Sequence, residues 1–328
     1  MNDLPVKSEE VRYYNIQQNS IAALASKDLA EMTAQELDSN WNLNLYFGEI
    51  KVITSNVASE RFMREQQELA SIGLHEGDYT LFPGVDGASL DPSIWKRANN
   101  WDPHDTDKQK QGRMGCFMAH YYAIRDSAEK LDAAQVKLKD LLNQEGTSPE
   151  LIQQAEAEVK KHSTVLIIED NNGFGRMTGD YTATLEGSGK NLRDTLKDLP
   201  HDWDMFYFIA MADEWGESQE ITPNLLQLNY GVVTKCYAIN SKMYNPILDY
   251  VEGIIQSDLP IPPIDNVIAD LHRYSKSYTS KIPLTYRFGS ISEVQTVSKS
   301  IKNWQPIITK IKKSSSSYYC FTPYTKHI

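Results

Sequence analysis

Apolar residues in the middle of the chain fall into two patterns, short continuous runs and longer stretches with helical spacing. Continuous runs favour strands that are covered on both faces of a sheet. Such runs predict strands at 49–54, 79–83 and 164–168. Helices are predicted at 58–72, where Phe62, Leu69 and Ile72 share one face, and at 113–128. A strand followed at once by a helix is typical of an α/β unit.

The same alternation continues toward the C-terminus. Further strands are predicted at 203–210 and 234–239, and further helices at 241–256 and 264–274. Alternating strands and helices are typical of a sheet whose strands are mainly parallel. We therefore expect an α/β fold with a Rossmann-type, mainly parallel sheet flanked by helices.

One segment interrupts this alternation. Residues 129–161 are rich in acids and lysines and contain no aromatic residue. A seam of apolar residues runs along its first half, at Leu131, Ala134, Leu138 and Leu141. Gly146 ends one helix, and Pro149 suits the first turn of the next. We expect an inserted antiparallel helical hairpin, either a solvated structural arm or a surface for a partner or a second copy.

Both ends of the chain differ from the middle. Residues 9–46 are mostly helix-forming, with a capping box from Thr33 to Glu36, which predicts an N-terminal helical extension over residues 1–48. A basic tail is predicted over residues 293–328. From Val294 to Ile328 it has six lysines and no acid, so this stretch carries +6 against 27 − 44 = −17 for residues 1–293. The tail is expected to dock on this acidic body or to contact an anionic membrane surface.

Composition then excludes several classes of protein. Lysine and arginine number 33 against 44 acids, a net charge of −11, which argues against a nucleic-acid binder. The three cysteines are far apart and odd in number, so we expect reduced thiols. The N-terminus is polar and no apolar run approaches the ~20 residues that span a bilayer, which predicts a cytoplasmic protein, peripheral at the inner membrane face if the tail binds lipid.

Common catalytic motifs are also missing from the sequence. It contains no HExxH, no GxSxG and no GxxxxGK[ST], and the turn after the first strand, Thr54-Ser55-Asn56, lacks GxGxxG. Metalloprotease, serine hydrolase, P-loop and dinucleotide-oxidoreductase functions therefore lose their usual support.

The strongest chemical signal lies at the end of the strand at 164–168. This buried strand runs directly into Glu169, Asp170 and Asn171. Ligands of open α/β sheets bind at the carboxyl ends of the strands. Carboxylate and amide oxygens there suit a hard divalent cation that bridges to phosphates, although solvated acids or a helix cap would have the same sequence.

Six short motifs in order, covering roughly residues 49–292, resemble glycosyltransferase family 25. This family includes lipopolysaccharide-modifying sugar transferases and collagen hydroxylysine galactosyltransferases. The motifs are Arg61, Phe82-Pro83-Gly84-Val85-Asp86-Gly87, Gly115-Cys116-Phe117-Met118-Ala119-His120, Ile168-Glu169-Asp170-Asn171, Leu199-Pro200-His201-Asp202-Trp203-Asp204 and Pro263-Ile264-Asp265.

The resemblance implies a GT-A-type domain that transfers galactose or glucose from a UDP-hexose, with inversion, to a glycan or glycolipid acceptor. It also implies a divalent metal, Mn²⁺ or Mg²⁺, at a motif that is usually Glu-Asp-Asp. Asp170 and Asn171 are the metal candidates, with His272 as a late histidine ligand. Asn171 departs from the family pattern, since an amide offers an oxygen without the negative charge.

Donor-site candidates come from the same resemblance and from the strand ends. They are Thr54, Arg61, Asp86, Gly115, His120 and Glu169. Arg61 pairs with phosphate in this interpretation, or forms a surface salt bridge. His120 bonds the donor or is a satisfied core histidine. Cys116 is interpreted as a packed thiol, because nothing in the sequence around it activates a thiolate.

The acceptor needs a base, and Asp265 is the first candidate. It follows Pro262-Pro263 at the start of a helix, where a carboxylate is also an ordinary cap. Asp213 and Glu214 are the substitutes. The alternative to an enzyme is a catalytically silent homologue that binds nucleotide-sugar or acts as an interaction scaffold, which Asn171 and Ala119, in place of the family's serine, both favour.

Overall fold

The computed structural model describes residues 43–98, 105–174, 176–177, 183–184, 188–212 and 218–287. Several expectations lie outside these residues. They are residues 1–42 of the N-terminal helical extension, the basic tail, and the substitute bases Asp213 and Glu214.

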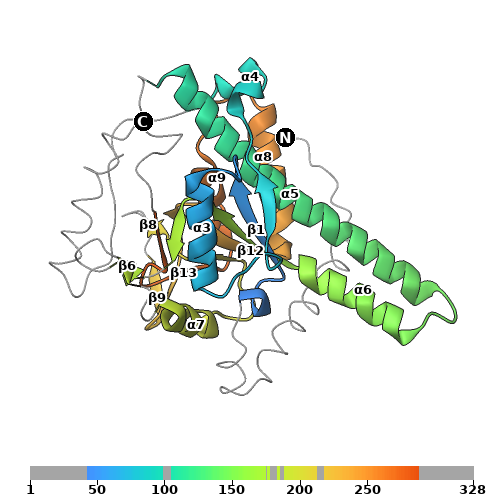
Figure 1. Cartoon of the computed structure of the whole chain (residues 1–328). Helices are drawn as coiled ribbons and strands as arrows, with labels where there is room; N and C mark the ends of the chain where they lie inside the picture. The colour runs from blue at the N-terminus through green and yellow to red at the C-terminus, as the bar shows by residue number, and fades with distance from the viewer. Residues whose placement is uncertain are drawn as a thin grey trace.

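The described residues form a mixed α/β fold around an eight-stranded sheet (Figure 1). In spatial order, the strands are β2 (Thr80–Pro83), β1 (Glu49–Thr54), β3 (Thr164–Glu169), β12 (Cys236–Asn240), β7 (Met205–Tyr207), β13 (Ser277–Ser280), β10 (Leu225–Gln227) and β9 (Gln219–Thr222). β12 and β10 run against the other six. The predicted α/β class and mostly parallel sheet are confirmed, but the strand predicted at 234–239 is antiparallel to both of its neighbours.

Short strand pairs lie outside this sheet. They join β11 (Gly231–Val232) to β8 (Met211–Ala212), β14 (Thr285–Arg287) to β4 (Asn172–Phe174), and β5 (Arg176–Met177) to β6 (Ala183–Thr184). Single 3-10 turns are η1 (Leu43–Leu45), η2 (Gly87–Ser89), η3 (Ser241–Met243) and η4 (His272–Tyr274).

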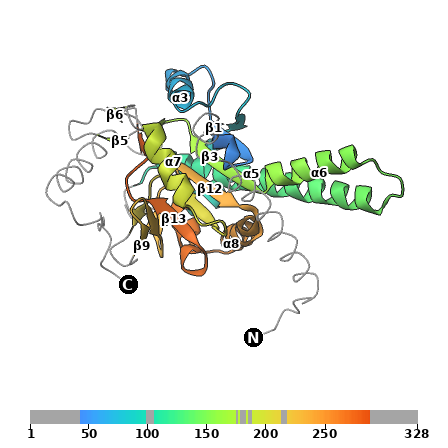
Figure 2. The ribbon, with the colours of Figure 1, turned by 90° about the horizontal axis from the view of Figure 1, so that it is seen from below.

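Helices cover both faces of the sheet. On one face lie α3 (Glu60–Ser71) and α7 (Ser188–Asp198); on the other lie α5 (Asp107–Asn143), α8 (Tyr244–Gln256) and α9 (Ile264–Ala269). Figure 2 shows α3 and α8 on opposite sides of the sheet. The remaining helices are α4 (Pro92–Trp95) and α6 (Pro149–His162). None of the helices in the described part of the chain combines the length and apolar character that crossing a membrane requires.

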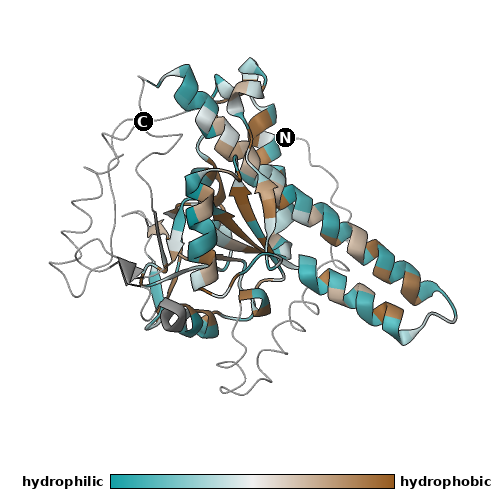
Figure 3. Ribbon diagram, in the orientation of Figure 1, coloured by the Kyte–Doolittle hydropathy of each residue, from teal (hydrophilic) through white to brown (hydrophobic). Residues whose placement is uncertain are grey.

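Strand β3 lies near the middle of the sheet and is buried on both faces. Val165 and Ile167 pack with α5 and α8 in one core, whereas Leu166 and Ile168 pack with α3 in the other. This two-sided burial explains its continuous apolar sequence. Figure 3 shows the central strands as the most hydrophobic part of the fold and the outer face of α3 as hydrophilic.

The predicted hairpin is present, but its first arm is not a separate helix. α5 runs without interruption for 37 residues from the core into the hairpin, and α6 returns beside it (Figure 1). Gly146 adopts φ +80° in the turn, a left-handed conformation that suits glycine, and Ser148 caps α6. The helix expected at 113–128 and the first arm of the insertion are therefore one element.

An ion network around buried Lys51 attaches α5 to the first strand. Lys51 of β1 is fully buried, and its Nζ donates to the carbonyl of Ala123 at 2.7 Å and to Oγ of Ser127 at 2.6 Å. Its charge is balanced by Asp126 at 2.8 Å and by Glu49 at 3.6 Å. Burial by itself raises the pKa of Glu49, but His162 and the two lysines Lys51 and Lys130 outweigh it and lower that pKa to about 2.

We predict that Lys51→Met lowers the free energy of unfolding by about 3 kcal/mol, because it removes the buried partner of two carboxylates. Urea denaturation followed by circular dichroism measures this loss. The matched control is Lys130→Met, since Lys130 pairs with the same two acids, Glu49 at 3.1 Å and Asp126 at 2.7 Å, but is 40% exposed. The control should cost less than about 1 kcal/mol. Equal losses would show that the burial of Lys51 does not increase its contribution to the free energy of unfolding.

Candidate functional site

The site is built where β1 and β3, which are parallel neighbours, end at the same edge of the sheet. Ile53 pairs with Glu169 in register, and the amide of Asp170 donates to the carbonyl of Ile53 at 3.1 Å. These contacts fix the backbone of the acidic motif against the end of β1. The helix α3 begins just beyond, with Ser59 capping it.

Arg61, in the first turn of α3, pairs with Asp170. Its Nη2 lies 2.8 Å from Oδ1 and 3.1 Å from Oδ2 of that carboxylate. Asp170 is almost fully buried, whereas about a quarter of the Arg61 side chain is exposed. Arg61 and Asp170, which were predicted for the site from separate motifs, are therefore brought together. The guanidinium of Arg61 is the more exposed of the two groups.

Lys235, which no sequence motif indicated, is the second cation of the site. Its Nζ lies 3.0 Å from Oε2 of Glu169 and 2.7 Å from Oδ1 of Asn171. Because β12 runs antiparallel to β3, the residue just before β12 meets the end of β3, and the amide of Glu169 donates to the carbonyl of Lys235 at 2.8 Å. A parallel strand would have placed Lys235 at the opposite edge of the sheet.

The turn before Lys235 has an unusual backbone. Val233 adopts φ 105°, a region that β-branched residues rarely occupy. Such conformations cost about 1–3 kcal/mol and cluster at functional sites, where the surrounding structure maintains them. This observation supports a functional role for the segment that carries Lys235.

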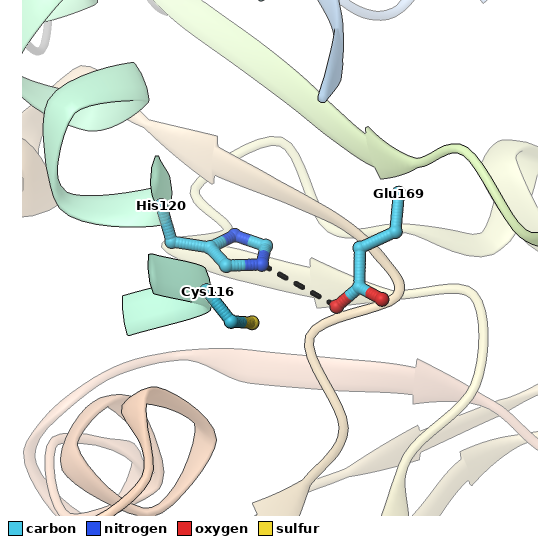
Figure 4. Close-up of side chains that lie close together, drawn as sticks. All are labelled: Cys116, His120 and Glu169. Carbon is cyan, nitrogen blue, oxygen red and sulfur yellow. Dashed lines mark hydrogen bonds and ion pairs between the residues drawn. The ribbon is translucent and has the colours of Figure 1, made fainter. Parts of the chain in front are cut away.

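Helix α5 contributes Cys116 and His120 to the same place, as Figure 4 shows. Nε2 of His120 lies 3.4 Å from Oε1 of Glu169, and its Nδ1 lies 3.0 Å from the hydroxyl of Tyr237. Burial by itself raises the pKa of Glu169, but Lys235 and His120 outweigh it and lower that pKa to about 2. Glu169 is therefore a carboxylate at neutral pH.

The surroundings of Cys116 favour the thiol form over the thiolate. Burial, together with the nearby carboxyls of Glu169 and Asp265, raises its pKa above the ordinary value. A nucleophilic cysteine needs the opposite shift. This agrees with the interpretation of Cys116 as a packed thiol.

Asp265 lies in the first turn of α9 and faces the same group of side chains. Its Oδ1 accepts from the amide of Asn266 at 3.0 Å. Burial, and in addition the carboxylate of Glu169, raises its pKa, whereas His120 lowers it. A carboxylate with a raised pKa is a better proton acceptor, so the position and chemistry of Asp265 suit a general base.

His272 does not join the acidic motif in the described structure. It is buried, its Nε2 lies 3.0 Å from the hydroxyl of Tyr207, and burial lowers its pKa to about 3. None of its described contacts is with Asp170 or Asn171. Its surroundings are those of a neutral core histidine.

In the described structure, cationic side chains contact the oxygens of Asp170 and Asn171, the first two residues of the predicted divalent-metal set. Asp170 binds Arg61 through both oxygens, and Asn171 directs its oxygen to Lys235. The ammonium of Lys235 lies between the oxygens of Glu169 and Asn171. The protein thus places a positive charge of its own at this position. Among the described residues, Cys116, His120 and Glu169 also have the chemistry to hold a metal, since their donor atoms all lie within 4.8 Å of one another.

Three further candidates have backbone roles. Oγ1 of buried Thr54 accepts from the amide of Asn56 at 3.3 Å, and Oδ1 of Asp86 accepts from the amide of Ala88 at 3.0 Å. Gly115 and Gly87 let α5 lie directly on the loop after β2, because a Cβ at Gly115 would collide with the carbonyl of Val85. The glycines bring Cys116 and His120 close to the sheet end.

We predict that Gly115→Ala lowers the free energy of unfolding by about 2 kcal/mol, since the added methyl overpacks the contact between α5 and the loop. The matched control is Gly253→Ala in α8, where a Cβ meets nothing within 4 Å. There the same change should stabilise the protein by up to ~1 kcal/mol, because alanine favours helices. Thermal and urea unfolding of both variants test this. Stabilisation by both changes would contradict the close packing at Gly115.

Comparison with known proteins adds no assignment. No protein-family model matches the chain, and no curated protein is significantly similar to it. The resemblance to glycosyltransferase family 25 therefore rests on the six motifs, and any function on the geometry described above.

Proposed function

We propose that the chain is a UDP-hexose-dependent glycosyltransferase that transfers galactose or glucose, with inversion, to a hydroxyl of a glycan or glycolipid. One observation carries the proposal. At the carboxyl end of the parallel strands β1 and β3, Arg61 contacts Asp170 and Lys235 contacts Glu169, both in the motif 169–171. This is where α/β sheets bind ligands, and two cations there suit a diphosphate. The order of the family motifs supports the same conclusion.

The chemistry assigns a role to each group. An acceptor hydroxyl oxygen attacks the anomeric carbon, its proton moves to Asp265, and the bond from that carbon to the UDP oxygen breaks. Negative charge develops on the leaving diphosphate, and Arg61 and Lys235 stabilise it. Glu169 orients two side chains. Nζ of Lys235 lies 3.0 Å from its Oε2, and Nε2 of His120 lies 3.4 Å from its Oε1.

The direct test is UDP release from UDP-galactose and UDP-glucose by the purified full chain, with glycan and glycolipid acceptors and with water alone. Parallel reactions with added manganese and with a chelator measure metal dependence. Acceptor-stimulated UDP release is the expected result, and the difference between the manganese and chelator reactions gives its metal dependence. Donor binding without release under every condition would instead support the catalytically silent alternative, and no binding at all would overturn the proposal.

We predict that Lys235→Ala lowers UDP-hexose affinity about 10- to 100-fold, because a charge-assisted hydrogen bond contributes about 1.5–3 kcal/mol. Isothermal titration calorimetry of the folded variant measures the change. Lys281→Ala is the control, since Lys281, just after β13, also pairs with an acid, but this acid is Glu220 on the edge strand β9, at 2.7 Å. The control should bind normally. An unchanged affinity in Lys235→Ala would remove Lys235 from the donor site.

Asp265→Asn tests the base separately. We predict that kcat falls about 10²- to 10⁴-fold while the donor dissociation constant changes little, since the amide keeps the shape but accepts no proton. Steady-state kinetics and donor titration give the two quantities independently. A parallel loss of donor affinity would assign Asp265 to donor recognition rather than to proton transfer.

A further inference from the structure

Cys116, His120 and Glu169 carry an inference that is independent of sugar transfer. Each offers one donor atom of a different kind, a thiol sulfur, an imidazole nitrogen and a carboxylate oxygen, and the three atoms lie within 4.8 Å of one another. Figure 4 shows the side chains pointing toward one point from α5 and from the end of β3. Among the described residues, this group of His, Cys and acidic side chains is close enough together to hold a metal ion.

The separation between His120 and Glu169 has the length expected across a metal ion. Nε2 and Oε1 lie 3.4 Å apart, longer than a strong hydrogen bond. Two ligands that bind tetrahedral zinc at their usual bond lengths are separated by about 3.3 Å. An ion therefore fits between these atoms with little movement of either side chain.

The backbone fixes all three ligands before any ion binds. Cys116 and His120 are four residues apart on α5, so they share one helical face. Glu169 is held in the sheet by its amide bond to the carbonyl of Lys235 at 2.8 Å. A helical pair with i, i+4 spacing completed by a ligand from another element is a common arrangement at zinc sites.

A second contact orients the imidazole. Nδ1 of His120 lies 3.0 Å from the hydroxyl of Tyr237, which is fully buried on β12. When Nδ1–H donates to this oxygen, the lone pair of Nε2 faces Glu169 and Cys116. Metal-binding histidines are usually held in this way through their other nitrogen.

We propose that Cys116, His120 and Glu169 form a site for a borderline transition-metal ion, with Zn²⁺ as the fitting ion. One sulfur, one nitrogen and one oxygen suit zinc, whereas Mg²⁺, Mn²⁺ and Ca²⁺ prefer oxygen ligands. Binding replaces the thiol proton of Cys116, which leaves to solvent as the sulfur–zinc bond forms. Three protein ligands leave the fourth position open to water or substrate, the pattern of catalytic rather than structural zinc sites. The metal takes Oε1 of Glu169, because Lys235 binds Oε2.

Cobalt(II) titration of the full chain, first stripped of metal with a chelator, tests the site without any enzymatic assay. A tetrahedral thiolate site gives a near-ultraviolet thiolate-to-cobalt band together with intense visible bands. We expect both bands at one cobalt per chain, and we expect Zn²⁺ to remove them by displacement. Mn²⁺ should compete at least 100-fold less well, because the sulfur and nitrogen ligands disfavour it.

Variants identify the ligands. Cys116→Ser should abolish the thiolate band, and His120→Asn should weaken cobalt binding at least tenfold. The controls are Cys236→Ser, whose thiol lies in the opposite core, and Cys320→Ser; both should keep the band. If Cys236→Ser does not fold, Cys320→Ser remains as the control for the presence of another cysteine.

Two results would overturn the proposal. One is a folded wild-type protein that shows no thiolate band at millimolar cobalt. The other is a band that persists in folded Cys116→Ser. Both are read without UDP-sugar, so failure of the metal site and failure of the proposed transferase activity are distinguishable.

Discussion

The antiparallel pairing of β12 with β3 is the constraint on which the site depends. Its register sets Cys236 opposite Ile168, so Lys235 meets Glu169 and Tyr237 meets His120. A largely buried carboxylate such as Glu169 loses hydration, and the charge of Lys235 offsets this loss. A single reversed strand thus supplies both the counter-ion of the acidic motif and the anchor of the imidazole.

The elements that could be predicted are those with a local signal. The apolar runs predicted β1 and β3 closely, and the helical spacing predicted α3. Strand direction has no such signal, because an apolar run has the same sequence pattern in either orientation. The sheet around β12 was therefore expected to be parallel, and Lys235 was overlooked. The length of α5 was missed for a related reason, since a change in composition at 129 does not end a helix.

Part of the site could also be predicted. Acids at the end of a buried strand gave Glu169 and Asp170 directly, and the family motif added Arg61, which the structure places on Asp170. The roles of the other candidates depend on tertiary contacts that sequence does not reveal. Gly115 proved to be a point of close packing, and His272 bonds Tyr207 away from the acidic motif.

Helix α5 joins the site to the far end of the hairpin as one stiff rod. From Cys116 to Asn143 its sequence contains neither glycine nor proline, the residues at which helices usually kink. At 1.5 Å per residue this span is about 40 Å long. Lys51 holds α5 at Ala123, close to the site, and the longer outer part of the helix extends beyond this contact. A movement of the hairpin tip therefore moves the helical turn that bears Cys116 and His120 as well.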